Sequence, residues 1–231
     1  MNIDNHNAPL DVTQPAPANT TAVALTQVPA TASFAQLGLN AELQSSAIQA
    51  GFTVPTPVQA EAIPHALQGT DVMAKAQTGS GKTVAYVLPL LQRLMATATS
   101  REDAPKKRVT QVLVLVPTRE LATQVSDVLR DLARPLTQSI KVGTVFGGVS
   151  INPQMMSLRS GADVVVATPG RLLDIVDHNA LNLGHVQHLV LDEADRLLDL
   201  GFAEELHRIL ALLSAKRQNL LFSATFEPAV Q

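Results

Sequence analysis

The stretch Ala76–Thr83, with the sequence AQTGSGKT, constrains the fold of this chain more than any other segment. It follows a short apolar run, Val72–Ala74, and precedes a longer apolar run of helical character, Val84–Leu94. This order predicts a strand, a glycine-rich loop and the start of a helix. Gly79 and Gly81 permit tight turns that aim backbone N–H groups at one point, which is how such loops bind a phosphate chain.

Two polar side chains at the end of this stretch suit the same ligand. Lys82 can reach the outer phosphates of a nucleotide, and the Thr83 hydroxyl can bind Mg²⁺. The usual pattern has glycine where this chain has Ala76, a small change if that residue keeps a negative φ. An ordinary polar turn before a helix is the alternative. We predict a nucleotide-binding loop made of Gln77, Thr78, Gly79, Ser80, Gly81, Lys82 and Thr83.

Composition limits the other classes of protein. The 231 residues are 46% hydrophobic, enough for one domain with a sizeable core. The chain has no cysteine, which excludes disulfides and thiolate metal sites. Its net charge of -3 is less basic than that of a dedicated nucleic-acid binder, so such contacts would come from a local basic face or another domain. No secretory signal or membrane-length apolar run is evident, which favours a cytoplasmic location.

The first 33 residues differ in composition from the rest. They are rich in Ala, Thr, Pro, Asn and Gln, and no helical or strand period persists there. We expect residues 1–33 to be a disordered tail and residues 34–231 to be the folded domain.

Between the tail and the glycine-rich loop, Phe52 and Gln59 flank two prolines that force an extended turn. Gln59 carries both a donor and an acceptor, which suits the edge of a purine such as adenine. A plain loop that leads into a helix at Pro57 is the alternative, and by itself it is the better interpretation.

The second half of the chain repeats one theme, an apolar strand that ends in a polar cluster. The runs are Val112–Val116, Val142–Phe146, Val164–Ala167, His188–Leu191 and Leu220–Phe222, with helix-like segments between them. This alternation predicts an α/β fold, a mostly parallel sheet with helices on both faces. Ligand sites in such sheets lie beyond the carboxyl ends of the strands, so the clusters should form one site with the glycine-rich loop.

The cluster after His188–Leu191 is acidic. Adjacent strand residues point to opposite sides, so Asp192 and Glu193 can do different jobs. Asp192 can hold Mg²⁺, directly or through water, and Glu193 can orient and deprotonate an attacking water. Two carboxylates at the start of the next helix, favoured by its dipole, are the alternative.

Two further groups of polar residues follow strands. Ser223 and Thr225 can hydrogen-bond Asp195, or they can cap a helix before Glu227. Close-approach glycines, hydroxyls and arginines suit a sugar–phosphate backbone, although each arginine alone is better explained by a surface ion pair. This second group comprises Arg119, Gly147, Gly148, Thr168, Gly170 and Arg171.

With these residues in order, residues 34–231 resemble the first RecA-like domain of a DEAD-box RNA helicase, a P-loop NTPase. The motifs of that family are present in family order: the Q motif, AQTGSGKT, PTREL, a GG doublet, TPGR, DEAD and SAT. The resemblance implies an RNA-dependent ATPase that couples ATP and Mg²⁺ to RNA binding and duplex unwinding.

The resemblance also implies roles for single residues. Phe52 would stack on adenine and Gln59 would hydrogen-bond its edge, while Val54 replaces a basic residue that many members carry there. Lys82, Asp192 and Glu193 would be catalytic, with Thr83 and Asp192 at the metal. Asp195, Ser223 and Thr225 would couple the site to RNA. Sequence-independent contacts to the RNA backbone would come from Thr118, Arg119, Gly148, Thr168 and Arg171.

The sequence ends soon after SAT, and we expect the family's second RecA-like domain, with its arginine fingers, to be required for full activity. The chain alone should then bind adenine nucleotide, hydrolyse it poorly and unwind nothing. Two other readings stay open: a DNA-acting helicase or translocase of the same superfamily, and a non-enzymatic, nucleotide-gated or partner-binding module.

Overall fold

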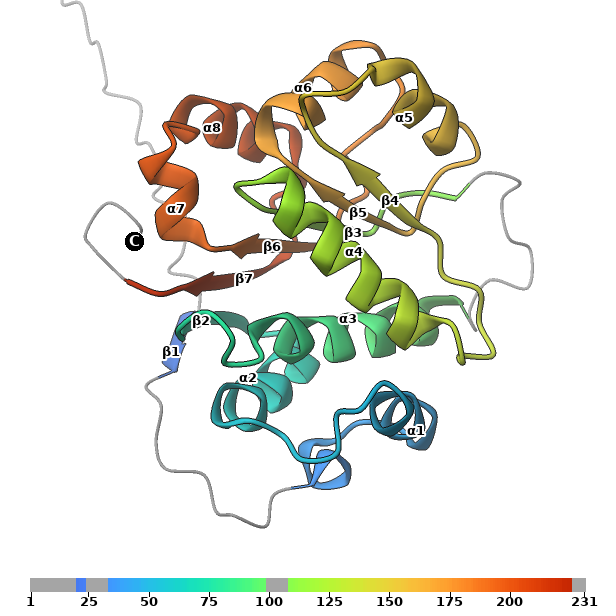
Figure 1. Ribbon diagram of the computed structural model, residues 1–231, viewed down its shortest axis with the longest axis vertical. Coiled ribbons are helices and arrows are strands. Elements are labelled where there is room, and N and C mark those ends of the chain that lie inside the picture. Colours follow the sequence, from blue (N-terminus) through green and yellow to red (C-terminus); the bar gives the residue numbers. More distant parts are fainter. Residues whose placement is uncertain (1–19, 24–32, 99–107, 226–231) are drawn as a thin grey trace, which may run out of the picture.

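The computed structural model describes residues 20–23, 33–98 and 108–225 (Figure 1). Seven strands in these residues form a single sheet in which every neighbouring pair is parallel, in the order β1-β2-β7-β6-β3-β5-β4. Their bounds are β1 Thr20–Val23, β2 Asp71–Lys75, β3 Val112–Leu115, β4 Val142–Val145, β5 Val164–Ala167, β6 His188–Asp192 and β7 Gln218–Ser223. The predicted strands are present, and the predicted α/β class is confirmed.

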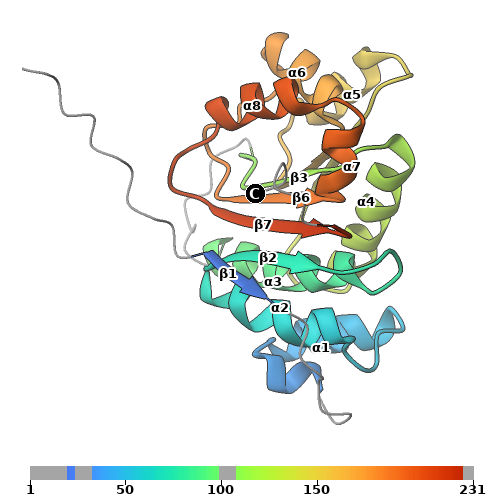
Figure 2. The ribbon, with the colours of Figure 1, turned by 90° about the vertical axis from the view of Figure 1, so that its left-hand side faces the viewer.

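Helices connect the strands and cover both faces of the sheet, as Figure 2 shows. They are α1 Ala41–Gln49, α2 Pro57–Gln68, α3 Lys82–Ala98, α4 Arg119–Ala133, α5 Ile151–Leu158, α6 Pro169–Asp177, α7 Ala194–Asp199 and α8 Ala203–Leu212, preceded by a 3₁₀ turn at Phe34–Leu37. Among the described residues, no helix is both long enough and apolar enough to cross a membrane.

Two hydrophobic cores lie on opposite faces of the sheet, because successive strand residues point to opposite sides. In the first core, Val112 and Val114 of β3 pack with α1 to α4. In the second core, Leu113 and Leu115 of β3 pack with α5 to α8. All four β3 residues are fully buried. The continuous apolar runs in the sequence are therefore strands covered on both faces.

The amino-terminal stretch departs from the expected disordered tail at four residues. Thr20–Val23 forms β1, which adds in parallel to the outer edge of β2. The segment contains two threonines and a valine, residues that favour extended backbone. The rest of residues 1–32 lies outside the described part of the chain.

The sheet order divides its carboxyl edge into two halves. β2, β7 and β6 are neighbours and lead into the glycine-rich loop, the SAT residues and the acidic cluster. β3, β5 and β4 are neighbours and lead into the PTREL, TPGR and GG residues. Thus one edge of the sheet carries all of the predicted site residues that follow a strand.

Candidate functional site

The glycine-rich loop leaves β2 and turns directly into α3. Gly79 and Gly81 have φ values of 80° and 91°, in the left-handed region that favours glycine. The Ala76 N–H donates to the Ser223 carbonyl at 3.0 Å, which fixes the loop to the end of β7. Backbone geometry thus explains why the sequence places glycines at these two positions.

Gln59 joins the start of α2 to this loop. Its side chain is 2% exposed, its Nε2 donates to the Gly81 carbonyl at 3.0 Å, and its Oε1 accepts from the Thr56 N–H at 3.0 Å. A Cβ on residue 81 would lie 2.4 Å from Gln59 Nε2, so a larger residue there would displace the Gln59 side chain. One amide hydrogen and one lone pair of Gln59 remain for a ligand.

Lys82 is the first residue of α3 and lies 7% exposed. Its Nζ and the buried Ser80 hydroxyl have no hydrogen-bond partner within the described part of the chain. Burying an ammonium group without a hydrogen-bond acceptor is costly, and an anionic ligand would provide one. The donor set of this loop therefore fits a nucleotide phosphate chain.

Asp192 ends β6 and is 2% exposed. Its Oδ2 accepts from the Tyr86 hydroxyl at 2.8 Å, and its Oδ1 accepts from the Glu193 N–H at 3.0 Å. Burial raises the pKa of Asp192, while the Tyr86 hydrogen bond and the charge of Lys82 act in the opposite direction. Burial and the neighbouring Asp192 likewise raise the pKa of Tyr86 well above its usual range, against a hydrogen bond with Thr83.

Residues that could hold a metal here are few. Among the described residues, no three His, Cys, Asp or Glu side chains group closely enough to hold a metal ion. Mg²⁺ keeps several waters and is bound by one or two carboxylates together with substrate phosphates. Asp192 and Thr83 fit that pattern.

Glu193 occupies the turn between β6 and α7 with a φ of 52°. The left-handed region costs a non-glycine residue of order 1–3 kcal/mol, and such strain is concentrated at functional sites. Glu193 Oε2 lies 3.5 Å from Arg196 Nη1, whereas the Asp192 carboxylate accepts from Tyr86 and from the Glu193 N–H. Glu193 lies in the turn after β6 and not in the strand, so the alternation of strand side chains does not apply to it, and its charge still acts on Asp192.

Asp195 ties the start of α7 to the end of β7. Its Oδ2 accepts from the Ala224 N–H, the Thr225 N–H and the Thr225 hydroxyl at 3.0–3.1 Å, and its own N–H donates to Ser223 Oγ at 3.2 Å. Burial alone would raise the pKa of Asp195, but these hydrogen bonds and one from the Arg196 N–H lower it. The helix after Thr225 that was the alternative would lie in residues 226–231, outside those described.

The other half of the edge holds the second predicted group. Thr118 Oγ1 caps α4 by accepting from the Leu121 N–H, while Arg119 is exposed and forms an ion pair with its neighbour Glu120. Arg171 is mostly buried and donates from Nη2 to the Val149 carbonyl at 2.9 Å, next to Gly148 with its φ of 80°.

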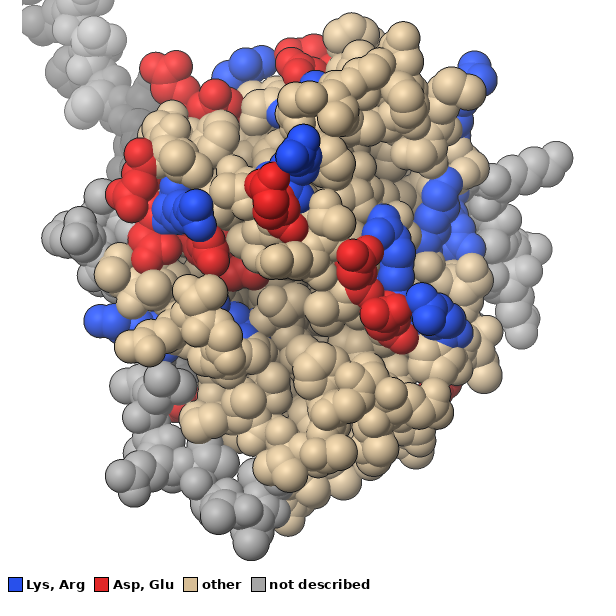
Figure 3. All heavy atoms as spheres, in the orientation of Figure 1, with Lys and Arg blue, Asp and Glu red and all other residues tan. Residues whose placement is uncertain are grey.

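Thr168, at the start of α6, is 9% exposed. Its N–H donates to the Val145 carbonyl at 3.1 Å, which joins the ends of β5 and β4. Figure 3 shows basic side chains interspersed with acidic ones on the face it presents, rather than one large basic patch.

Phe52 is not brought to the loop in the same way as Gln59. Its side chain packs against the first core and lines a hollow of about 530 Å³ with residues of α1 and of the carboxyl end of α4. Nearby Val54 is 64% exposed. The adenine contact of Phe52 therefore stays a prediction.

Sequence reasoning missed Tyr86 and Thr56. Tyr86 lies in the apolar run of α3, where a buried hydroxyl needs a partner, and this is the signal that could have marked it. Thr56 is the N-cap of α2 and donates its N–H to the Gln59 side chain, and the spacing of a threonine three residues before a glutamine is the signal that could have marked this contact.

Comparison with known proteins identifies the family to which the chain is similar. A family model described as DEAD/DEAH box helicase matches residues 56–231. "ATP-dependent RNA helicase DRS1" of Lodderomyces elongisporus is 47% identical over 194 residues, which cover 83% of this chain and 27% of that protein. "ATP-dependent RNA helicase DeaD" of Escherichia coli K12 is 43% identical over 198 residues, or 86% of this chain and 30% of that protein.

A third relative, "DEAD-box ATP-dependent RNA helicase CshA" of Streptococcus pneumoniae, is 43% identical over 198 residues, covering 86% of this chain and 36% of that protein. The chain thus spans between 27% and 36% of the length of these three relatives.

Proposed function

Because the chain belongs to the DEAD/DEAH box helicase family, we propose that it forms the ATP-binding RecA-like domain of an ATP-dependent RNA helicase. The observation that carries this proposal is the buried ammonium group of Lys82, which has no partner among the described residues and lies at a glycine-rich loop. A phosphate chain supplies the missing negative charge.

In this proposal, each residue of the nucleotide half has a stated task. The loop from Gln77 to Thr83 binds the phosphates through backbone N–H groups and Lys82. Thr83 and Asp192 hold Mg²⁺, directly or through water, and the bound ion neutralises charge on the phosphate oxygens. Glu193 orients the attacking water and accepts its proton. Gln59 and Phe52 contact the adenine.

The RNA half supplies sequence-independent contacts. Thr118, Arg119, Gly148, Thr168 and Arg171 bind the sugar–phosphate backbone, so RNA is selected with little regard to base sequence. Asp195, Ser223 and Thr225 couple the two halves, which is supported by the hydrogen bonds between the ends of β6 and β7. A second RecA-like domain completes both sites, so residues 1–231 alone bind nucleotide but hydrolyse it poorly.

Nucleotide binding is tested with Lys82→Ala and a charge-matched control, Lys216→Ala, at an exposed position before β7. Loss of a hydrogen bond to a charged group costs about 1.5–3 kcal/mol, so ADP should bind about 10- to 100-fold more weakly to the first variant. Calorimetric titration should show wild-type affinity for the second. Equal ADP affinity in all three proteins would refute the nucleotide site.

RNA binding is tested with Arg119→Ala and with Arg134→Ala, two exposed arginines at opposite ends of α4. Loss of one phosphate contact should weaken binding of single-stranded RNA uniformly across sequences and reduce the salt slope by about one. Only the Arg119 variant should behave in this way. A loss confined to one RNA sequence, or a similar loss in both variants, would argue against this contact.

A further inference from the structure

Tyr86 lies where α3 passes closest to the end of β6. It is one turn after Lys82 and Thr83, so the three side chains share a helix face. Its ring packs against Phe222 of β7, with centroids 5.2 Å apart and planes tilted by 54°. Phe222 is the register partner of Asp192 in the parallel pair of β6 and β7. The ring is therefore held beside the residue that its hydroxyl contacts.

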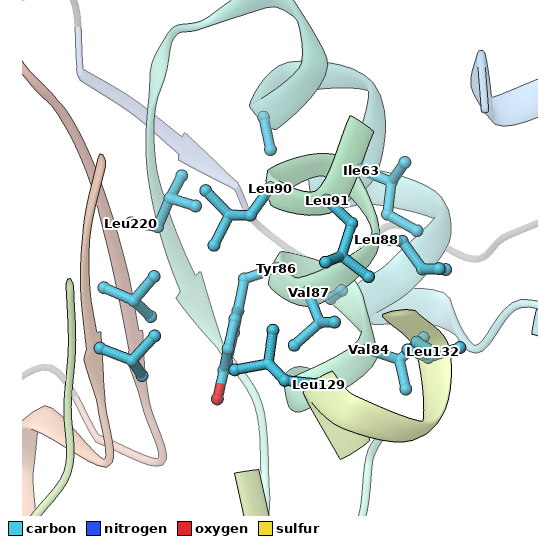
Figure 4. Packing of buried hydrophobic residues seen from close by; sticks show 14 of the residues in the cluster. Ile63, Val84, Tyr86, Val87, Leu88, Leu90, Leu91, Leu129, Leu132 and Leu220 are labelled. Carbon is cyan, nitrogen blue, oxygen red and sulfur yellow. The ribbon is translucent and has the colours of Figure 1, made fainter. Parts of the chain in front are cut away.

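The hydroxyl end of Tyr86 is the polar part of a buried side chain. Figure 4 shows the ring beside aliphatic residues of the first core, with the oxygen pointing away from Leu90 and Leu91. Tyr86 is fully buried and Asp192 is 2% exposed, so neither group can rely on solvent in place of the other. The 2.8 Å bond between them satisfies both.

The geometry also fixes the orientation of the Asp192 carboxylate. Rotation about the bond that carries a carboxylate is normally broad. Here one oxygen accepts from Tyr86 and the other from the Glu193 N–H, so the plane of the group is held at two points. Each oxygen keeps a lone pair for a further contact.

We propose that Tyr86 is a positioning residue, whose hydroxyl holds the Asp192 carboxylate in the orientation that receives the Mg²⁺ of a bound nucleotide. This inference rests on the proposed function, since it assigns Asp192 to the metal. It adds a residue from outside the glycine-rich loop and the acidic cluster. Groups that orient a metal-binding carboxylate in this way commonly change metal affinity by about 10- to 100-fold.

The test compares Tyr86→Phe with wild type. The variant keeps the ring against Phe222 and removes the hydroxyl alone. Mg²⁺ is titrated into the chain saturated with a fluorescent ADP analogue, and the midpoint is recorded. We expect the midpoint to move to about 10-fold higher Mg²⁺ in the variant, with unchanged affinity for the analogue in EDTA.

Val87→Ala is the matched control, because Val87 is a fully buried neighbour in the same core and has no polar group. The cavity left by Val87→Ala lowers the stability of the fold but leaves the Asp192 hydrogen bonds in place. The midpoint of the Mg²⁺ titration should therefore equal that of wild type. An unchanged midpoint in Tyr86→Phe, or an equal shift in Val87→Ala, would overturn the inference.

The wild-type chain provides a second measurement that needs no variant. Tyr86 is its single tyrosine and it has no tryptophan, so intrinsic emission reports on Tyr86 alone. Adding Mg²⁺ to the chain already saturated with ADP should change that emission. The reason is that the metal would bind the Asp192 carboxylate, which accepts the hydrogen bond of the Tyr86 hydroxyl. Constant emission would overturn the inference even if Tyr86→Phe failed to fold.

Different results would contradict the proposed function and the inference about Tyr86. A wild-type chain that binds no ADP analogue, with or without Mg²⁺, contradicts the proposed function and the inference with it. Normal binding with no effect of the hydroxyl on the Mg²⁺ midpoint contradicts the inference alone.

Discussion

Single residues at the nucleotide half differ in how the fold satisfies them. Asp192 has a donor at each oxygen, whereas Lys82 has no partner among the described residues. A buried carboxylate that accepts a hydrogen bond at each oxygen is held in one orientation, whereas a buried ammonium group without an acceptor can bind an anionic ligand. This contrast fits the proposed roles of Asp192 at the metal and of Lys82 at the phosphates.

Gly81 and Gly79 provide a prediction at this scale. Both have left-handed φ values, but a Cβ at residue 81 would meet Gln59 Nε2 at 2.4 Å, while one at residue 79 meets nothing within 4 Å. Each alanine variant should lose about 1–2 kcal/mol for the backbone strain. Gly81→Ala should lose about 1 kcal/mol more, because Gln59 must give up its bond to the loop.

Urea unfolding of the two variants beside wild type measures this difference. The reciprocal variant, Gln59→Ala, removes the closest contact and leaves Thr56 Oγ1 at 3.0 Å, so the extra cost of Gly81→Ala over Gly79→Ala should become smaller in that background. Equal losses for both glycines in the wild-type background would show that the Gln59 contact does not constrain residue 81.

The sequence was sufficient to predict the glycines, Lys82 and the acidic pair, because phosphate and Mg²⁺ require those residue types in a strand–loop–helix order. It was not sufficient for Tyr86, whose partner lies 106 residues away. That contact depends on β6 and β7 lying side by side, which no local pattern specifies. The same holds for the bond from Gln59 to the Gly81 carbonyl, which joins residues 22 positions apart.

At the scale of elements, the link between α7 and the end of β7 depends on one carboxylate. Asp195 accepts three hydrogen bonds from Ala224 and Thr225 at Oδ2. The local sequence predicted β2 to β7 because these runs are apolar, whereas β1 lies in the stretch that was expected to be disordered. The order β2-β7-β6-β3-β5-β4 is a long-range property, and it alone decides that SAT lies between the glycine-rich loop and the acidic cluster.

This link predicts a pH dependence of stability. The hydrogen bonds outweigh burial and lower the pKa of Asp195 in the folded chain. The ionised form therefore stabilises the fold, fully so above the unfolded pKa of about 3.9, and this contribution is lost as pH falls through the lower folded value. The gap in free energy of unfolding between wild type and Asp195→Asn should be constant down to about pH 5 and then narrow.

Denaturant unfolding across this range, with the exposed Asp199→Asn on the same helix as control, measures the gap. The control should show little gap at any pH. A wild-type advantage over Asp195→Asn that grew as the pH was lowered would mean that the sign of the shift is wrong.

At the scale of the whole molecule, one edge of the sheet carries the two proposed sites side by side. The halves formed by β2, β7 and β6 and by β3, β5 and β4 meet at β6 and β3, where β6 ends in Asp192. If the proposed function holds, nucleotide and RNA bind at adjacent strands. The fold class follows from the alternation of strands and helices in the sequence, whereas this division follows only from the strand order.

At this scale we predict that residues 1–231 hydrolyse ATP slowly. Arginine fingers of related NTPases contribute about 10³–10⁵ in rate. Residues 1–231 should therefore bind ADP yet hydrolyse ATP far more slowly than a full-length relative such as the E. coli DeaD helicase, with little stimulation by single-stranded RNA. Glu193→Gln, which lacks the carboxylate proposed to accept the proton of the attacking water, gives the background rate of ATP hydrolysis. Robust RNA-stimulated turnover by residues 1–231 would contradict the need for a second domain.

The division of the edge can be measured most directly by amide hydrogen exchange of the chain with and without MgADP. We predict protection in residues 76–83, at the start of α2 around Gln59 and in residues 192–195. Exchange at residues 147–148 and 168–171, which we assign to RNA, should not change. Protection of those residues in place of the glycine-rich loop, or no protection at saturating MgADP, would contradict the placement of the nucleotide at β2, β7 and β6.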